Sequence, residues 1–288
     1  MVCPRFFSSL AACLYLSALV TEVSLPAAAQ TPPAATAAPV PAADPCGDTN
    51  LLATTDRPTF GTNPCVVKPQ EAIVELGYRN TTTSGAGASH VAAFPENRDR
   101  IGLLPHVELV LDLPSELRLA ASGTTTVGQS NIGSGLKYEF GYFGSFVHGI
   151  AAEVVYPTAS APFTNGLPSF NESYQIGGGI VKNVGFNLTV GFNSFATPAA
   201  SGGKNASTTA FDPTLILGGA VAPNTKLNVE VANNSSNGPG SSGQYFGNIF
   251  LQHQFTKAVL VDVEVEQRLT TVNGKHAHYI GAGGALRL

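Results

Sequence analysis

The sequence contains no tryptophan, one methionine and four cysteines among 288 residues, and only 12% of its side chains are charged. Lys and Arg number 15 against 19 Asp and Glu, so the chain offers no basic face for a nucleic acid. Beyond the N-terminal segment there is no run of about 18 apolar residues, which excludes a membrane-spanning helix. Glycine and proline are abundant instead, with 31 and 20 residues, and they favour strands and turns over helices.

Residues 1–29 have the pattern of a secretory signal peptide. Arg5 precedes an apolar core at residues 6–20, and small residues follow up to the alanines at 27–29. We expect cleavage near Gln30 and export of the mature chain. The alternative is a buried N-terminal helix.

The cysteines divide into two pairs. Cys3 and Cys13 lie inside the expected signal peptide and leave with it, and Cys13 lacks the cleavage pattern of a lipoprotein. Cys46 and Cys65 remain, and in an exported chain this pair predicts a disulfide.

Three further regions follow the signal peptide. Residues 30–45 are rich in Ala and Pro and predict a disordered leader. Residues 46–70 predict a periplasmic N-terminal segment, closed by the disulfide, that packs under or into the domain that follows. Residues 71–288 form that domain.

Within residues 71–288, very short connections alternate with long ones. The short ones lie at 104–106, 142–144, 183–184, 223–224 and 256–257, and the long ones at 80–89, 122–129, 158–170, 196–208, 233–241 and 271–275. Outer-membrane barrels have tight periplasmic turns and longer external loops. The fold class predicted is therefore all-β, a transmembrane antiparallel β-barrel of the outer membrane with about 12 strands. The expected strands are 71–80, 90–103, 106–121, 130–141, 145–157, 171–182, 185–195, 209–222, 225–233, 242–255, 258–269 and 276–288.

Several of these strands alternate sharply between apolar and polar residues. In 258–266, the valines at 259, 261, 263 and 265 oppose Asp262, Glu264 and Glu266. An Arg or Lys that faces lipid at mid-depth costs about 2–4 kcal/mol, so the charged face is expected to line the lumen. A soluble two-faced sheet is the alternative. The lumen candidates are Glu75, Arg79, Glu108, Asp112, Lys137, Glu139, Glu153, Glu230, Asp262, Glu264, Glu266, Arg268 and Arg287.

The excess of acidic residues among these candidates leaves two interpretations open. They either give an open, negative channel that disfavours anions, or they pair with basic residues and fill the barrel, with residues 46–70 as a further obstruction.

Two features connect the barrel to its surroundings. Residues 282–288 resemble the C-terminal signal that the barrel assembly machinery recognises, with Leu288 in place of the usual aromatic residue. Tyr and Phe side chains are expected to form girdles at the lipid interfaces; plausible members are Tyr78, Tyr138, Tyr142, Phe143, Tyr156 and Phe186. The expected partners are therefore outer-membrane lipid, the assembly machinery and a small-molecule solute.

Several motifs resemble the outer-membrane, transporter-like family named for the MetA pathway of phenol degradation. They lie at residues 56–60, 63–64 and 66–69, which lead into 74–78, and at 100–103, 107–109, 135–138 and 156–158. The resemblance implies passage of small, aromatic or hydrophobic compounds across the outer membrane.

No catalytic site is expected. His276 and His278 lie two apart on a strand, but spacing fixes no acidic or cysteine partner for a metal. His90, His106, His148 and His253 are isolated, and Gly177 to Gly179 lack the context of a phosphate loop. No cofactor is expected. The leading hypothesis is a channel or transporter-like barrel, the second is a closed structural or surface-binding barrel, and the third is a lipid-modifying enzyme.

Overall fold

The computed structural model describes residues 46, 50–85, 87–161, 163, 167–181, 184–197, 206–234, 244–271 and 274–288. The expected signal peptide and the leader at 30–45 lie outside these residues. Within the described part, helix α2 (Leu51–Thr54) is the only helix, and no helix there is long and apolar enough to cross a membrane.

The other elements are all strands. They are β1 (Ala72–Ser84), β2 (Ser89–Leu104), β3 (Val107–Leu113), β4 (Glu116–Ala121), β5 (Thr124–Gln129), β6 (Ile132–Phe143), β7 (Phe146–Tyr156), β8 (Ser169–Val181), β9 (Val184–Thr197), β10 (Ala206–Ala222), β11 (Thr225–Asn234), β12 (Gln244–Gln254), β13 (Val259–Arg268) and β14 (His276–Arg287).

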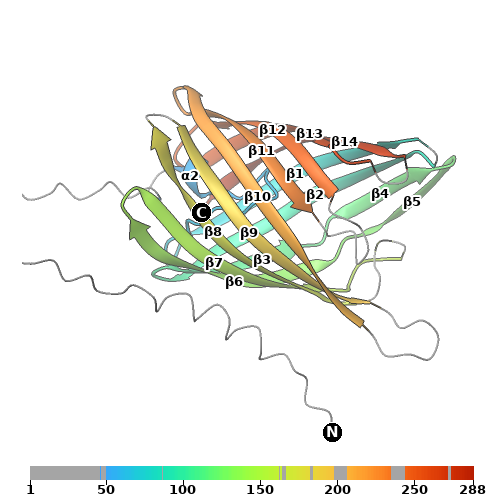
Figure 1. Ribbon diagram of the computed structural model, residues 1–288, viewed down its shortest axis with the longest axis horizontal. Helices are drawn as coiled ribbons and strands as arrows, with labels where there is room; N and C mark the ends of the chain where they lie inside the picture. Colours follow the sequence, from blue (N-terminus) through green and yellow to red (C-terminus); the bar gives the residue numbers. More distant parts are fainter. Residues whose placement is uncertain are drawn as a thin grey trace, which may run out of the picture. The chain divides into compact units, whose positions relative to one another are not determined.

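The strands form one antiparallel sheet that closes on itself (Figure 1). Strand β1 pairs with β14 on one side and with β2 on the other, so twelve of the strands make a closed ring, and β4 and β5 lie outside it. The predicted fold, an antiparallel barrel of about 12 strands, is confirmed. We call the end with the β2–β3, β6–β7, β8–β9, β10–β11 and β12–β13 connections the short-turn end, and the other the long-loop end.

The hairpin of β4 and β5 departs from the prediction. The expected strand 106–121 is split at Pro114, which has no N–H to donate to a ladder. Its second half, β4, pairs with the part of β2 that extends past β3. The expected long loop 122–129 is also wrong: Ser122 and Gly123 form a tight turn with φ of 50° and 79°, and the β-prone Thr and Val residues after it form β5. Figure 1 shows this hairpin at the long-loop end.

Other long connections are shorter than expected because the strands continue into them. Strand β1 runs to Ser84 and β2 begins at Ser89, so the expected loop 80–89 shrinks to a turn. The short connections at Pro105 and His106, and at Pro223 and Asn224, lie where they were predicted.

The barrel is apolar outside and polar inside. On β13, Val263 and Val265 are 53% and 62% exposed, whereas Glu264 and Glu266 are each 1% exposed. Of the expected girdle residues, all but the half-buried Phe186 are exposed. A soluble two-faced sheet would place its polar face in water, whereas here the apolar face is outermost, as a lipid environment requires.

Candidate functional site

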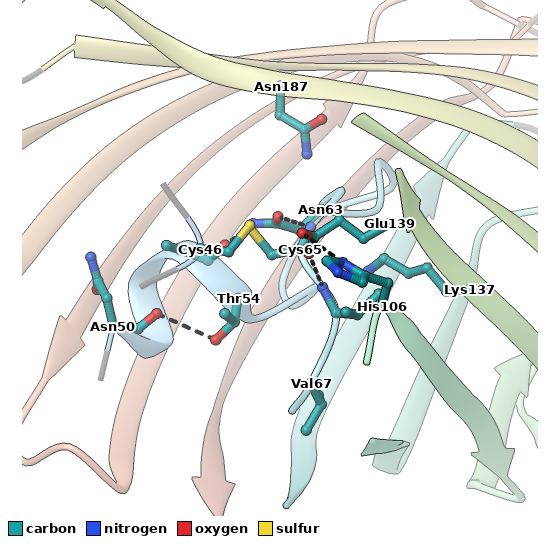
Figure 2. Close-up of a disulfide and its surroundings, with 12 residues drawn as sticks. Cys46, Asn50, Thr54, Asn63, Cys65, Val67, His106, Lys137, Glu139 and Asn187 are labelled. Atoms are coloured by element: carbon teal, nitrogen blue, oxygen red, sulfur yellow. Dashed lines mark hydrogen bonds and ion pairs between the residues drawn. A yellow bond between two sulfur atoms is a disulfide. The ribbon is translucent and has the colours of Figure 1, made fainter. Parts of the chain in front are cut away.

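Residues 50–70, which we call the lumen plug, lie inside the barrel. Figure 2 shows α2 and the Cys46–Cys65 disulfide with barrel strands around them. The plug joins the wall at the short-turn end, where the N–H of Gln70 donates to the carbonyl of Gly102 at 3.3 Å. Of the two expected placements of this segment, under or into the barrel, the described residues 50–70 have the second.

Carboxylates of the wall accept hydrogen bonds from the plug backbone. The N–H groups of Asp56 and Arg57 donate to the two oxygens of Glu75 at 3.0 and 2.7 Å. Those of Phe60 and Gly61 both donate to Glu230 Oε1 at 2.9 Å. Backbone donors buried in a lumen need partners, and a carboxylate acceptor gives a stronger hydrogen bond than a neutral one.

The return half of the plug is held in the same way. The N–H of Val67 donates to Glu108 Oε2 at 2.7 Å, and that of Val66 donates to Glu139 Oε2 at 3.3 Å. Glu75, Glu108 and Glu230 are fully buried. These wall carboxylates, on β1, β3, β6 and β11, therefore act first as acceptors for the plug.

Arg100 on β2 links the wall carboxylates to the plug. Its side chain is fully buried, and its Nε and Nη2 donate to the two oxygens of Glu108, each at 2.9 Å. Nη1 lies 3.4 Å from Glu75 Oε1, and the guanidinium also donates to the plug carbonyls of Thr54 and Cys65. One cation thus compensates two buried carboxylates and two plug carbonyls.

Asp56 is the plug's own contribution to this network. Lys137 Nζ lies 3.4 Å from its Oδ1, and Arg98 and Arg100 lie 3.7 and 3.6 Å from its Oδ2. Burial opposes ionisation of Asp56, but these three cations hold its pKa below the ordinary value. The plug is therefore bound to the wall by charge as well as by backbone hydrogen bonds.

A second cluster holds the apex of the plug. Arg57 lies 3.1 Å from Glu96 and 3.5 Å from Asp262. The ring of Phe60 lies 5.2 Å from that of Phe246, and the Arg79 guanidinium lies 5.7 Å from the Phe60 centroid. Phe246 thus contributes an apolar contact inside a polar lumen.

The structure places all the predicted lumen candidates on the inner face but divides them among three places. Those that contact the plug are Glu75, Glu108, Lys137, Glu139, Glu230 and Asp262. Other candidates contact one another or Arg98 across the lumen. Asp112 and Glu153 pair with Arg98 at 2.8 and 3.0 Å, and Arg79 lies 3.8 Å from Glu264. Glu266 is buried beside these, while Arg268 and Arg287 lie near the two ends of the barrel.

Sequence reasoning missed Asp56, Arg57, Glu96, Arg98 and Arg100. The register of β1 with β2 shifts between Gly77 and Arg79. Because of this shift, the buried positions of β2 are odd-numbered before it, as at Ala93, and even-numbered after it, as at Arg100. This shift obscures the alternation over the whole strand. Glu96, Arg98 and Arg100 nevertheless follow one another with a period of two, and this pattern could have identified them as residues of the inner face.

Two cavities flank the plug along the β8–β11 wall. The upper cavity, about 390 Å³, faces the long-loop end, and its inward-facing charged residues include Asp112, Glu153 and Asp212. The lower cavity, about 310 Å³, faces the short-turn end. Between them the carbonyl of Thr62 accepts hydrogen bonds from Asn187 Nδ2 at 2.9 Å and Thr189 Oγ1 at 3.2 Å. This neck separates the two cavities.

The disulfide links Cys65 of the plug to Cys46, which precedes the plug in the sequence. Cys46 and Cys65 are 19 residues apart in sequence and 5.5 Å apart between Cα atoms, and both are buried beside Val147. Closing a loop of this size removes unfolded conformations.

Reduction of this disulfide is expected to destabilise the folded protein by about 3 kcal/mol. Denaturant unfolding followed by circular dichroism, with and without dithiothreitol, measures the effect. The double variant Cys46→Ser/Cys65→Ser is the control, and it should unfold identically under both conditions. An untreated wild type no more stable than the double variant would contradict the prediction.

Gly102 on β2 is required for the passage of the plug into β1. A Cβ atom built there would overlap the carbonyl oxygen of Lys68. Gly102→Ala is therefore expected to lower the free energy of unfolding by about 1–3 kcal/mol, the usual cost of overpacking. Gly179→Ala, where a Cβ meets no atom within 4 Å, is the matched control. Equal unfolding midpoints for the two variants would contradict this role.

In the described part of the chain, no group of three or more His, Cys, Asp or Glu side chains is arranged to hold a metal ion. His106 Nδ1 lies 3.5 Å from Glu139, His148 hydrogen-bonds Tyr174 at 3.1 Å, and His253 hydrogen-bonds Thr225 at 2.8 Å. These contacts are typical of structural roles.

Comparison with solved structures supports the barrel fold. No family model and no curated protein matches the sequence. Among solved structures, an outer-membrane channel from Pseudomonas putida F1 is similar, with a TM-score of 0.61 and 12% identity over 80% of this chain and 100% of that chain. The NanC porin aligns with a TM-score of 0.47 and 10% identity over 72% of this chain and 98% of its own. At 12% identity, the first likeness shows the fold of an outer-membrane barrel and no more.

Proposed function

We propose that the protein is an outer-membrane channel for small molecules whose lumen is narrowed by its own N-terminal segment. The observation that carries the proposal is the pair of cavities on either side of the plug, which approach each other at the Thr62 neck. A barrel whose lumen is filled only for stability would have no need of open space on both sides of the plug.

The neck is weaker than the rest of the plug attachment. Thr62 is held to β9 by two neutral hydrogen bonds. The plug residues before it are held more strongly, by charge-assisted hydrogen bonds to Glu75 and Glu230 and by the ion pairs of Asp56 with Arg100 and Lys137. A small displacement near Thr62 would join the cavities without breaking the ionic network. The proposed path therefore runs along β8–β11.

Outer-membrane location is part of the same proposal. It is supported by the apolar outer face and by the fold, and it requires export through the signal peptide at 1–29 and insertion by the barrel assembly machinery. The resemblance to the phenol-degradation family extends the proposal to aromatic or hydrophobic solutes.

Solute flux into proteoliposomes tests the proposal. Vesicles that contain the folded mature chain are expected to swell in small neutral sugars faster than protein-free vesicles, and to exclude larger ones. A folded, heat-modifiable barrel that admits no solute would reject it and leave the closed structural barrel, which the dense ionic network favours.

A further inference from the structure

The lower cavity contains one charged side chain, Lys226, among the described residues that line it. The same lysine lines a smaller cavity of about 210 Å³ at the short-turn end, again as its only described charge. Lys226 therefore lies between the two spaces, close to where a solute would enter or leave the lumen at this end.

Lys226 differs from the other inward-facing cations. In the described part of the structure its ammonium has neither a hydrogen bond nor an ion pair. Arg268 donates to Gln244 Oε1 at 3.3 Å and to the carbonyl of Lys275 at 2.6 Å. The other inward-facing cations each have at least one carboxylate within 4 Å; they are Arg57, Arg79, Arg98, Arg100, Lys137 and Arg287. A cation in a lumen, without a protein carboxylate, is available to an anion that enters from outside.

The wall positions this side chain. Lys226 lies two residues before Asn228 and four before Glu230, so it shares their inward face of β11. A Cβ atom built at Gly218 on β10 would overlap the Asn228 side chain and would lie 2.9 Å from Lys226 Cε. The glycine therefore leaves room for both side chains, Asn228 and Lys226, against the wall.

The rest of the lower cavity is largely apolar or backbone. Its lining includes Val147, Phe186, Ile216 and Pro64, together with glycines of β8 and β9. Apolar walls with one placed charge are the usual composition of a small-molecule site. The upper cavity, in contrast, has an excess of carboxylates over cations among its inward-facing residues.

We propose that the lower cavity binds a small organic anion, a monocarboxylate with a compact apolar or aromatic body, through the Lys226 ammonium. This inference rests on the proposed function, because it names the class of solute that the lumen receives at the short-turn end. It favours the second of the two interpretations of the lumen charges, because many of the acidic side chains are occupied by the plug and by arginines.

Equilibrium dialysis of the full mature chain, folded in detergent micelles, tests the inference with benzoate as the probe. Protein-free micelles give the background from partitioning. Saturable benzoate binding is expected, and Lys226→Met should weaken it about tenfold, as loss of one charge-assisted hydrogen bond would. The control Lys257→Met, at an exposed residue of the β12–β13 turn, should bind like the wild type.

Benzylammonium, of similar shape and opposite charge, should bind weakly and without dependence on Lys226. Absence of saturable benzoate binding, or equal binding by wild type and Lys226→Met, would overturn the inference. Potassium chloride conductance in planar bilayers without benzoate reports the proposed channel separately. Conductance without benzoate binding would reject only the anion site, whereas binding without conductance would reject the channel and keep the site.

Discussion

Deletion of residues 50–70 is expected to raise the single-channel conductance severalfold. The plug occupies the lumen from the short-turn end, past the Thr62 neck, to its apex at Phe60, and a twelve-strand barrel without it has space for a continuous aqueous path. The carboxylates that now accept plug N–H groups, such as Glu75 and Glu230, would then face water. The widened pore should therefore also select cations over anions.

Planar-bilayer recordings in symmetric and asymmetric potassium chloride measure both effects. A variant with residues 55–62 replaced by a glycine–serine repeat of equal length is the companion, because it keeps the tether and removes the side chains that bind the wall. This variant should show a smaller rise in conductance than the deletion, and its channels should close frequently. Unchanged conductance in both variants, with heat-modifiable barrels, would show that the plug does not limit the pore.

Arg100→Met is expected to be the most damaging single substitution in the barrel, lowering the free energy of unfolding by about 3–5 kcal/mol. Removal of this cation leaves Glu108, Glu75 and Asp56 buried with less compensation, and it removes the donor to the plug carbonyls of Thr54 and Cys65. The plug should also leave the lumen more often, with brief openings in the current.

Arg118→Met is the matched control. Arg118 pairs with Glu116 at 2.6 Å, but the two side chains are 65% and 49% exposed, and exposed pairs contribute about 0–1 kcal/mol. Denaturant titration in lipid vesicles, followed by circular dichroism, compares the two variants. Equal unfolding midpoints would show that the buried network does not hold the barrel together.

The sequence was sufficient for the barrel because the barrel's constraints are local. Alternation on β13 distinguishes Val263 from Glu264 by one residue, and lipid outside a closed sheet imposes that pattern strand by strand. Residues such as Pro223 and Asn224 end a strand because their own backbone preferences favour a turn. These features need no knowledge of distant contacts.

The plug could not be derived in the same way. Asp56 meets Lys137 and Arg100, and Phe60 meets Glu230, only after the barrel has closed around them. The sequence therefore left two interpretations of the lumen charges open, and the structure assigns many of them to holding the plug. The β4–β5 hairpin was missed because Thr124 to Thr126 read equally well as a polar loop and as a short strand.

Chemical cross-linking tests the position of the plug most directly. In a Thr62→Cys/Asn187→Cys variant, the new thiols belong to residues that are hydrogen-bonded in the structure, and a short bismaleimide should join them in the folded barrel. A Thr62→Cys/Val263→Cys variant, with the second thiol on the outer face of β13, is the control. Mass spectrometry should find the peptide link between 62 and 187 and none between 62 and 263. Absence of the 62–187 link in a folded barrel would contradict a lumen occupied by residues 50–70.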